Sequence, residues 1–179
     1  MTKINERITL VSQALVASEV WDILAREDVS LVASEQFDTF FIEQTPVYAV
    51  PDLLYKSEDG QWTIVDWKTG EEVEDNEDQV ALYALYVHEK HGVAPEQIRA
   101  RLEYLSLGIT KETSFTQEGL AEVEKRAKAS MAQMRKLLLD PVQNIPRPKI
   151  DFALTDARAM CPWCNFYELC QQELGRIVS

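Results

Sequence analysis

The sequence predicts an α/β fold in which a central mixed β-sheet is flanked by helices. The chain has 179 residues, 46% of them hydrophobic, which is enough for one ordinary domain with one sizeable core. Segments rich in β-branched and aromatic residues lie between long stretches of helical periodicity. Two of these segments are joined by a short Asp-Gly turn, which predicts an antiparallel pair.

The first element is a predicted helix from Ile4 to about Arg26. Apolar residues such as Ile8, Val11 and Leu15 recur there at helical spacing, so we expect one amphipathic helix that packs against the sheet. No apolar run in the sequence approaches the roughly 20 residues needed to span a bilayer. The N-terminus also lacks a secretory core, so the expected location is cytoplasmic.

Three strands follow, over residues 30–42, 47–55 and 61–67. The sequence Ser57-Glu58-Asp59-Gly60 separates the last two, and an Asp-Gly pair tolerates positive φ. Those two strands are therefore expected to pair antiparallel.

The second half of the chain predicts a helix, two strands and another helix. The first helix covers residues 75–91 and ends before Gly92, the strands cover 98–107 and 109–115, and the last helix covers 117–139. One apolar stripe on the last helix is expected in the core; it comprises Leu120, Val123, Ala127, Met131, Met134 and Leu138. Pro141, Pro146 and Pro148 predict an extended linker to a C-terminal piece.

The formal net charge of −12 argues against a generic nucleic-acid binder, because phosphate contacts need Lys and Arg. The charge is unevenly distributed. Residues 1–98 carry six basic and twenty acidic side chains, whereas residues 99–149 carry ten basic and six acidic ones. A local basic surface is therefore expected in the second half.

A candidate site lies at the tips of the two paired strands. Asp52 and Asp66 can face each other across the ladder, where two carboxylates repel unless a divalent cation binds them. Hard oxygen ligands of this kind suit Mg²⁺ or Mn²⁺. Strand alternation places Lys68 on the same face as Asp66, so metal and amine can activate a water for attack on a phosphodiester. The alternative is a surface ion pair between Asp66 and Lys68.

The residue between them, Trp67, is expected on the opposite face of the sheet. Its side chain is expected to belong to the core, and its backbone carbonyl is a candidate metal ligand.

Pro51-Asp52, a spacer, then Asp66-Trp67-Lys68-Thr69-Gly70 and Gln79-x-x-x-Tyr83 resemble the PD-(D/E)xK nuclease superfamily, in particular its RecB-type branch. That branch includes the nuclease domains of recombination helicase-nucleases and a CRISPR-associated nuclease. The resemblance implies a restriction-endonuclease-like core over residues 1–149. It also implies that Gln79 and Tyr83, which share a helix face, line the active site and contact substrate or Lys68.

The function implied by this resemblance is that of a metal-dependent DNA nuclease. We expect an exonuclease or end-processing enzyme of DNA repair, recombination or CRISPR-related DNA metabolism, acting with a helicase or integration-complex partner. Arg126 and Arg135 are candidates for part of a track for the DNA backbone. The alternative is that they form the exposed face of the long helix.

All three cysteines, Cys161, Cys164 and Cys170, lie near the C-terminus, which favours a metal site over a disulfide framework. Their spacing alone leaves zinc, an iron-sulfur cluster or unrelated thiols open. The resemblance implies a four-iron four-sulfur cluster in which a distant fourth cysteine joins these three. Residues 150–179 are then a small segment that packs on the nuclease core, within a single domain overall.

Two features of the branch are missing. There is no fourth cysteine, and the only histidines, His88 and His91, follow the Lys-Thr-Gly element, although many members carry an early histidine as a metal ligand. We hypothesise that the chain is a fragment or natural variant lacking the family's N-terminal segment. Glu35 or Glu19 would then be a substitute ligand, and an isolated preparation would contain little iron.

Two other classes of function stay open. The chain can be a catalytically weak structural or DNA-binding module in which the cysteine cluster, and not the acids, matters. It can also be a zinc-binding interaction domain whose nuclease signature is fortuitous.

Overall fold

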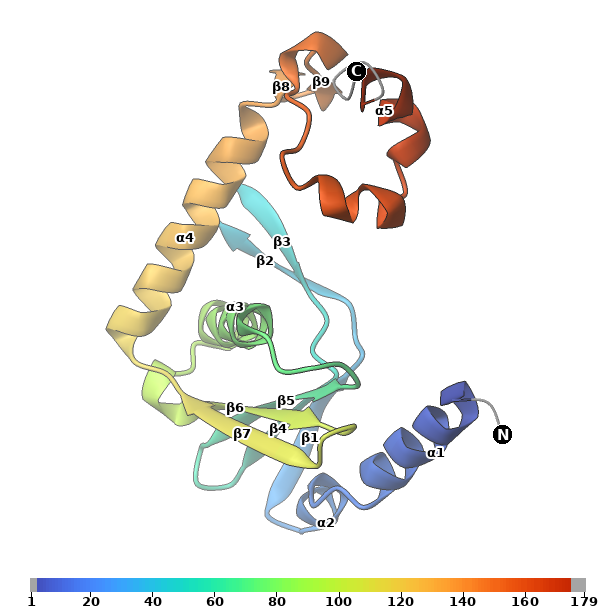
Figure 1. Cartoon of the computed structure of the whole chain (residues 1–179). Coiled ribbons are helices and arrows are strands. Elements are labelled where there is room, and N and C mark those ends of the chain that lie inside the picture. The colour runs from blue at the N-terminus through green and yellow to red at the C-terminus, as the bar shows by residue number, and fades with distance from the viewer. Residues whose placement is uncertain (1–2, 175–179) are drawn as a thin grey trace. The chain divides into compact units, whose positions relative to one another are not determined.

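The computed structural model describes residues 3–174, drawn as ribbons in Figure 1. The chain divides into two compact units. The first unit is Met1–Ser130 and the second unit is Met131–Ser179.

A five-stranded sheet lies at the centre of the first unit (Figure 1). In spatial order its strands are β1 (Val29–Ser34), β4 (Leu53–Ser57), β5 (Trp62–Lys68), β6 (Ile98–Tyr104) and β7 (Ile109–Ser114). The neighbours β5 and β6 run parallel, and the other neighbours run antiparallel. The predicted α/β class with a central mixed sheet is therefore confirmed. β1 and β7 form the two edges, and the pairing of β1 shifts register between Leu31 and Ala33.

The predicted hairpin is the β4–β5 pair. Gly60 has a φ of 87°, and the backbone N–H of Ser57 donates to the carbonyl of Gln61 at 2.9 Å, which closes the turn. The left-handed conformation at Gly60 suits glycine because a Cβ atom would strain it. The register pairs Leu53 with Val65, so the residues immediately before β4 lie opposite the end of β5.

The N-terminal region forms two helices, α1 (Lys3–Val16) and α2 (Val20–Leu24), so the single long helix predicted here is wrong. Ser18 lies at the break. Its hydroxyl oxygen accepts the backbone N–H of Val20 at 3.2 Å, and its O–H donates to Glu103 at 2.7 Å. A serine that binds backbone in this way competes with continued helix. Val20 is fully buried, whereas no residue of α1 is buried.

The segment between β1 and β4 contains a separate hairpin, β2 (Asp38–Ile42) with β3 (Thr45–Ala49). Sequence patterning merged β1 with β2 and β3 with β4, so the prediction of three strands over residues 30–67 is wrong: there are five. The hairpin packs on a helix, because Phe40 lies against Tyr86 with ring centroids 5.9 Å apart.

The helix after β5 is α3 (Glu74–His91), close to the predicted 75–91. It ends at Gly92, whose φ of 66° lets its N–H bind the carbonyl of His88. A short 3₁₀ turn, Pro95–Gln97, leads into β6. Because β5 and β6 are parallel, α3 is the crossover between them, and it covers one face of the sheet (Figure 1).

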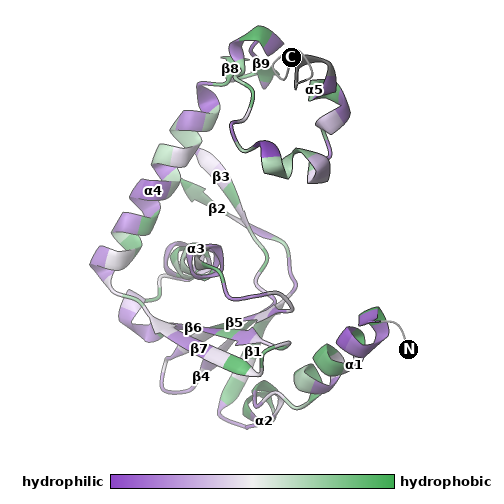
Figure 2. Ribbon diagram, viewed as in Figure 1, coloured by the Kyte–Doolittle hydropathy of each residue, from purple (hydrophilic) through white to green (hydrophobic). Residues whose placement is uncertain are grey.

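Apolar residues are buried on both faces of the sheet. On one face Val20 of α2 packs with Leu53, Tyr55 and Val65. On the other face α3 contributes its fully buried residues Val80, Ala84 and Val87. Figure 2 shows polar and apolar residues interspersed along helices such as α1 and α4 (Gln117–Arg135). The end of β5 lies between these two layers.

The long helix α4 (Gln117–Arg135) ends earlier than the predicted residue 139. Leu120 and Val123 are buried, but Met134 is 56% exposed. The expectation that the whole apolar stripe is core is therefore wrong. The reason is that only the first part of α4 belongs to the first unit, and its last turn belongs to the second.

The second unit contains short elements. They are β8 (Leu138–Asp140), β9 (Ile145–Pro146), two 3₁₀ helices (Lys149–Asp151 and Arg158–Trp163) and α5 (Tyr167–Leu174). β8 and β9 pair antiparallel, so the proline-rich stretch predicted as an extended linker forms a small hairpin instead. The two proline residues Pro141 and Pro146 fit a turn and a strand end, where no ladder hydrogen bond is needed.

A bilayer-spanning helix is not found among residues 3–174, because none of the described helices is both long and apolar enough.

Candidate active site

Two acidic residues lie opposite each other where β4 begins and β5 ends. Asp52 immediately precedes β4, and continuing the Leu53–Val65 register by one step pairs it with Asp66. The backbone N–H of Trp67 donates to Oδ2 of Asp52 at 2.8 Å. A side chain bound by the neighbouring strand has little freedom to turn away. Asp52 is thus fixed beside Asp66, as the sequence predicts.

Asp66 is one of two buried charged residues among the described part of the chain, and it is 2% exposed. The Nζ of Lys68 lies 2.7 Å from its Oδ2. That contact lacks the direction of a hydrogen bond, and Oδ2 has no other partner among the described residues. The distance between Lys68 Nζ and Asp66 Oδ2 establishes an ion pair, but the buried Oδ2 still lacks a hydrogen-bond donor aimed at it. Such an atom is costly to bury and suits a cation.

Burial raises the pKa of Asp66 above the ordinary value of 3.8, because a low-dielectric surrounding disfavours the charged carboxylate. The Lys68 ammonium opposes this shift through its close contact and its positive charge, and the negative charge of Asp52 adds to it. A divalent cation between the two carboxylates would favour the charged form of both.

Lys68 is the first member of a hydrogen-bonded chain. Its Nζ donates to Oε1 of Gln79 at 2.6 Å, and Nε2 of Gln79 donates to the Tyr83 hydroxyl at 3.0 Å. The Tyr83 O–H donates in turn to the carbonyl of Val50 at 3.0 Å. Gln79 and Tyr83 lie one turn apart on α3, which explains how both reach the end of β5. This series of hydrogen bonds ends at Val50, two residues before Asp52, so it connects Lys68 to the segment that carries Asp52.

Tyr83 stays a neutral donor in this network. Burial raises the pKa of its phenol, and the nearby charges of Asp66 and Asp52 act in the same direction, whereas Gln79 and Lys68 oppose them. A protonated phenol can donate to the Val50 carbonyl, which a phenolate cannot.

The backbone after Lys68 is also fixed. The carbonyl of Lys68 accepts the N–H of Leu105 at 2.9 Å. The carbonyl of Thr69 accepts both the Ser106 hydroxyl at 2.8 Å and Nη2 of Arg7 at 2.6 Å. The strand end that presents Asp66 and Lys68 is therefore tied to β6 and to α1.

Trp67 faces the other side of the sheet, as predicted. Its ring stacks on Trp21 of α2 with centroids 5.8 Å apart, and it packs against the cluster around Val65. Its Nε1 donates to Oε2 of Glu103 at 2.9 Å. The role of its carbonyl as a metal ligand stays a prediction.

Sequence reasoning missed Glu103, the second buried charged residue, which is 4% exposed. The signal was present in Arg101-Leu102-Glu103: two charged residues at alternating positions of an apolar strand share one face. A charged face of a strand is normally solvated, so this signal does not by itself indicate a buried residue. This face is buried because the α1–α2 junction covers it.

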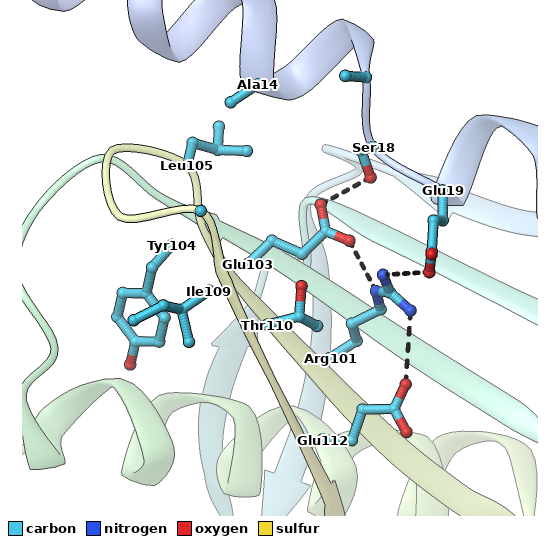
Figure 3. Close-up of a pocket in the computed structure, with 12 residues that line it drawn as sticks. Ala14, Ser18, Glu19, Arg101, Glu103, Tyr104, Leu105, Ile109, Thr110 and Glu112 are labelled. Carbon is cyan, nitrogen blue, oxygen red and sulfur yellow. Dashed lines mark hydrogen bonds and ion pairs between the residues drawn. The ribbon is translucent and has the colours of Figure 1, made fainter.

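The pocket in Figure 3 lies on the face of the sheet that carries Arg101 and Glu103, and its volume is about 570 Å³. Its polar groups bind one another: Arg101 contacts Glu103 at 2.6 Å, Glu19 at 3.1 Å and Glu112 at 3.4 Å. Asp52, Asp66 and Lys68 do not line it. Its size therefore does not make it the site of chemistry.

The residues present fit a magnesium or manganese ion in part. Asp52 and Asp66 supply carboxylate oxygens. Oδ2 of Asp66 accepts no hydrogen bond among the described residues, so it is available as a metal ligand. Mg²⁺ usually keeps several waters and needs only one or two carboxylates. Within residues 3–174, no group of three or more His, Cys, Asp or Glu side chains could hold a metal ion.

Neither substitute ligand completes such a group. Glu19 pairs with Arg101 on the opposite face of the sheet. Glu35 has a φ of 47°, and its backbone N–H approaches the carbonyls of Pro51 and Asp52 at 3.2 and 3.1 Å. Its carboxylate does not form a three-ligand cluster with the aspartates in the described part of the chain.

Two arginines were predicted to contact DNA. Arg126 on α4 forms an ion pair with Asp78 of α3 at 2.9 Å, and both side chains are more than half exposed. Arg135 lies at the end of α4 and also has a partner. Their contact with nucleic acid stays a prediction.

The three cysteines of the second unit are free thiols. Cys161, Cys164 and Cys170 line one pocket of about 440 Å³, together with apolar residues such as Phe152 and Met160. They do not form a preorganised metal cluster in the described residues. The iron-sulfur cluster stays a prediction.

The family model described as the PD-(D/E)XK nuclease superfamily matches residues 4–171. That span covers nearly the whole chain, including the two aspartates, Lys68 and the cysteines. The central mixed sheet with flanking helices agrees with the restriction-endonuclease-like core that the motif implied. A comparison with curated proteins found no match.

Proposed function

We propose that this chain, which belongs to the PD-(D/E)XK nuclease superfamily, is a divalent-metal-dependent nuclease that hydrolyses phosphodiester bonds in DNA. One observation carries the proposal. Asp52, Asp66, Lys68, Gln79 and Tyr83 come from three elements and form one continuous set of contacts at the end of β5. An incidental surface ion pair would not need a buried aspartate, a glutamine and a tyrosine around it.

Asp52 and Asp66 are the residues that would hold Mg²⁺ or Mn²⁺, with the Trp67 carbonyl as a further ligand. The ion, when bound, supplies positive charge that polarises the scissile phosphate and favours deprotonation of the attacking water. Asp52 is oriented for this by the Trp67 N–H, and Asp66 by Lys68.

Lys68 contributes the second positive charge of the site. An ammonium has three N–H donors, and the contacts with Asp66 and Gln79 fix its position. From there it can orient the water and stabilise the charge that develops on the phosphate oxygens. The water oxygen bonds to phosphorus as one P–O ester bond breaks, which leaves a phosphate end and a hydroxyl end.

Gln79 and Tyr83 position Lys68 and do not react. Gln79 accepts from Lys68 and donates to Tyr83, so its amide can adopt only one orientation. Tyr83 anchors that amide to the Val50 carbonyl. Pre-set positions of this kind lower the reorganisation needed in the transition state.

We further propose the RecB-type branch, in which the chain acts as an exonuclease or end-processing enzyme of DNA repair, recombination or CRISPR-related metabolism. Support comes from the Asp-Trp-Lys-Thr-Gly and Gln-x-x-x-Tyr elements and from the C-terminal cysteines. A helicase or integration-complex protein is the expected partner. The basic surplus of residues 99–149 would supply part of the DNA track, with Arg126 and Arg135 in it.

The test is cleavage of end-labelled single- and double-stranded DNA with Mg²⁺ or Mn²⁺. Asp66→Ala and Lys68→Ala should each lose about a hundredfold or more in rate, because each removes charge aimed at the phosphate. Glu58→Ala and Lys56→Ala are matched controls, since these exposed residues lie on the same hairpin outside the site. Equal cleavage by all five proteins would identify a contaminant and remove the proposal.

A second candidate is a catalytically weak DNA-binding or structural module built on the cysteines. The observation that favours it is that all three thiols line one pocket. Metal analysis and absorbance spectra of anaerobically purified protein separate iron from zinc. DNA binding without metal-dependent cleavage would favour this candidate, and zinc without DNA binding would favour an interaction domain.

A further inference from the structure

We propose that Glu103 is a positioning residue for the active site, acting from the opposite face of the sheet. It holds the indole of Trp67, and the backbone N–H of Trp67 in turn holds Asp52. The inference rests on the proposed function, since it assigns a role toward the Asp52–Asp66 site. It adds a residue that the nuclease motif does not include.

Glu103 is bound by three donors on one face of the sheet. Its Oε2 accepts from Nε1 of Trp67 at 2.9 Å and from the Ser18 hydroxyl at 2.7 Å. Its Oε1 accepts from Nε of Arg101 at 2.6 Å. At 4% exposure, Glu103 has little contact with water that could replace these donors. A buried carboxylate with donors on both oxygens has one allowed position.

Trp67 transmits that position to the metal-binding acids. It stands between Asp66 and Lys68 in β5, and its N–H is the donor that fixes Asp52 at 2.8 Å. Its ring is held by Glu103 at the indole nitrogen and by Trp21 on its face. The ring and this N–H belong to the same residue of β5, so we expect loosening of the ring to loosen the backbone that presents Asp66 and holds Asp52.

The fold explains why Glu103 reaches Trp67. The parallel pairing of β5 with β6 places Trp67 and Glu103 directly beside each other. Arg101 precedes Glu103 by two residues on the same face, and its guanidinium also binds Glu19 and Glu112. Figure 3 shows the contacts of Arg101 with Glu103, Glu19 and Glu112, and the contact of Ser18 with Glu103.

A different role for Glu103 would be to neutralise Arg101 only. In that case the bond to Trp67 would be incidental, and any change at Glu103 would act through stability alone. The two roles differ in one property: whether the Trp67–Asp52 contact loosens when the Glu103–Trp67 bond is removed and the fold remains.

The first measurement uses NMR on metal-free protein, so it does not depend on activity. Trp67→Phe keeps a ring on Trp21 but deletes the indole donor, and Glu103→Gln keeps the side-chain volume. In Glu103→Gln the Trp67 indole resonance should shift, and exchange of the Trp67 backbone amide should accelerate about tenfold, as expected for one weakened hydrogen bond. In Glu112→Gln, which bonds the same Arg101 without touching Trp67, both should stay as in the wild type.

The second measurement is steady-state cleavage with Mn²⁺, together with Mn²⁺ binding by electron paramagnetic resonance. Glu103→Gln and Trp67→Phe should each lower kcat about tenfold and weaken Mn²⁺ binding several-fold, with KM for DNA unchanged. Because both substitutions act on the same Glu103–Trp67 bond, which Trp67→Phe removes and Glu103→Gln weakens, the double variant should be no worse than the poorer single variant. Glu112→Gln should stay within twofold of the wild type.

The inference is overturned if Trp67 amide exchange and Mn²⁺ binding in folded Glu103→Gln equal those of the wild type. It is also overturned if the two single effects multiply in the double variant, or if Glu112→Gln is equally impaired. Failure of the proposed function would look different: wild-type protein would not cleave DNA, and Asp66→Asn would match it. The amide-exchange result would still decide whether Glu103 fixes the Asp52 contact.

Discussion

The two compact units differ in how their functional side chains are held. In the first unit, Asp52, Asp66, Lys68, Gln79 and Tyr83 are fixed by hydrogen bonds and ion pairs with one another and with the backbone. Within the described part of the second unit, up to residue 174, the three thiols line a pocket and few hydrogen-bonding contacts hold them. One is the N–H of Phe166, which lies 3.4 Å from Sγ of Cys164.

The difference follows from the chemistry of the side chains. Carboxylates, amides and ammonium groups make strong directed hydrogen bonds, so they can organise a site before a ligand binds. Thiols are weak donors and acceptors, and a cysteine site is normally organised by its metal or cluster. In the second unit, moreover, no residue from 131 to 171 is classed as buried, and Ile150 and Trp163 are 90% and 82% exposed. An acid–lysine site can thus be preformed, whereas a cysteine site cannot.

Metal removal should give the largest effect. EDTA should lower DNA cleavage at least about a thousandfold, and Mg²⁺ or Mn²⁺ alone should restore it, because in the proposed function the acids and not the thiols carry the chemistry. The triple variant Cys161→Ser, Cys164→Ser, Cys170→Ser should retain activity within about threefold. Loss of activity in a triple variant whose first unit remains folded would show that the two units do not differ in this way.

The second largest difference between the units is expected when a large apolar side chain is truncated in each. Leu54→Ala should lower the free energy of unfolding of the first unit by about 2 to 5 kcal/mol, since Leu54 is fully buried. Phe152→Ala in the second unit should cost about 1 kcal/mol or less, because Phe152 is 40% exposed. Urea denaturation followed by tryptophan fluorescence measures both. A Phe152→Ala loss as large as that of Leu54→Ala would mean that the second unit has a comparable core.

The link between Lys68 and Tyr83 provides the third prediction. Gln79→Ala should lower kcat about 10- to 100-fold, because Lys68 loses its acceptor and Tyr83 its donor. Tyr83→Phe should lower kcat less, by about threefold to tenfold. Glu77→Ala, on an exposed position of the same helix, is the control. Full activity in Gln79→Ala would argue against preorganisation of the first site.

Acidity should affect metal binding by Asp66. Because its folded pKa lies above the ordinary 3.8, protons compete with Mn²⁺ at higher pH than at an ordinary aspartate. In metal-free protein, acid has the opposite effect on stability. The folded state binds the Asp66 proton more tightly than the unfolded state does, so the free energy of unfolding rises as pH falls through the raised pKa. This gain is complete below pH 3.8. Denaturation of wild type and Asp66→Asn at several pH values measures it. Identical pH profiles would contradict the shift.

The smallest effect is expected at the base of the β2–β3 hairpin. A hydrogen bond from Lys90, and then one from the Thr39 N–H, lowers the pKa of Asp38. A lowered folded pKa stabilises the protein above 3.8, and this stability is lost as pH falls through the folded value. The pair is partly exposed, so Asp38→Asn should cost only about 0.5 to 1 kcal/mol near neutral pH. Asp22→Asn on α2 is the control, and equal losses would exclude the ion pair as the cause.

Much of the first unit could be predicted from local pattern. The Asp-Gly turn fixed the β4–β5 pairing, and that pairing with the alternation of β5 placed Asp52, Asp66 and Lys68 on one face. The four-residue spacing of Gln79 and Tyr83 placed both on one side of α3. Each of these inferences depends on residues close in sequence or joined by a tight turn.

What could not be predicted depends on distant contacts. The break at Ser18 is stabilised by Glu103, which lies 85 residues away. The division of residues 30–55 into four strands depends on packing of Phe40 and Ile42 beneath α3, which periodicity alone does not show. The burial of Glu103 is of the same kind, since a charged residue in a strand is normally solvated.

The edges of the five-stranded sheet have a consequence for association between copies. Unpaired strand edges are templates for fibril-like stacking. β1 is interrupted by its register shift near Val32, and β7 presents Lys111 and Glu112 among its polar residues. With a net charge of −12 as well, copies of the chain repel each other at low ionic strength. Concentrated salt screens that repulsion. The register shift of β1 and the charged residues of β7 are then the remaining barriers to aggregation.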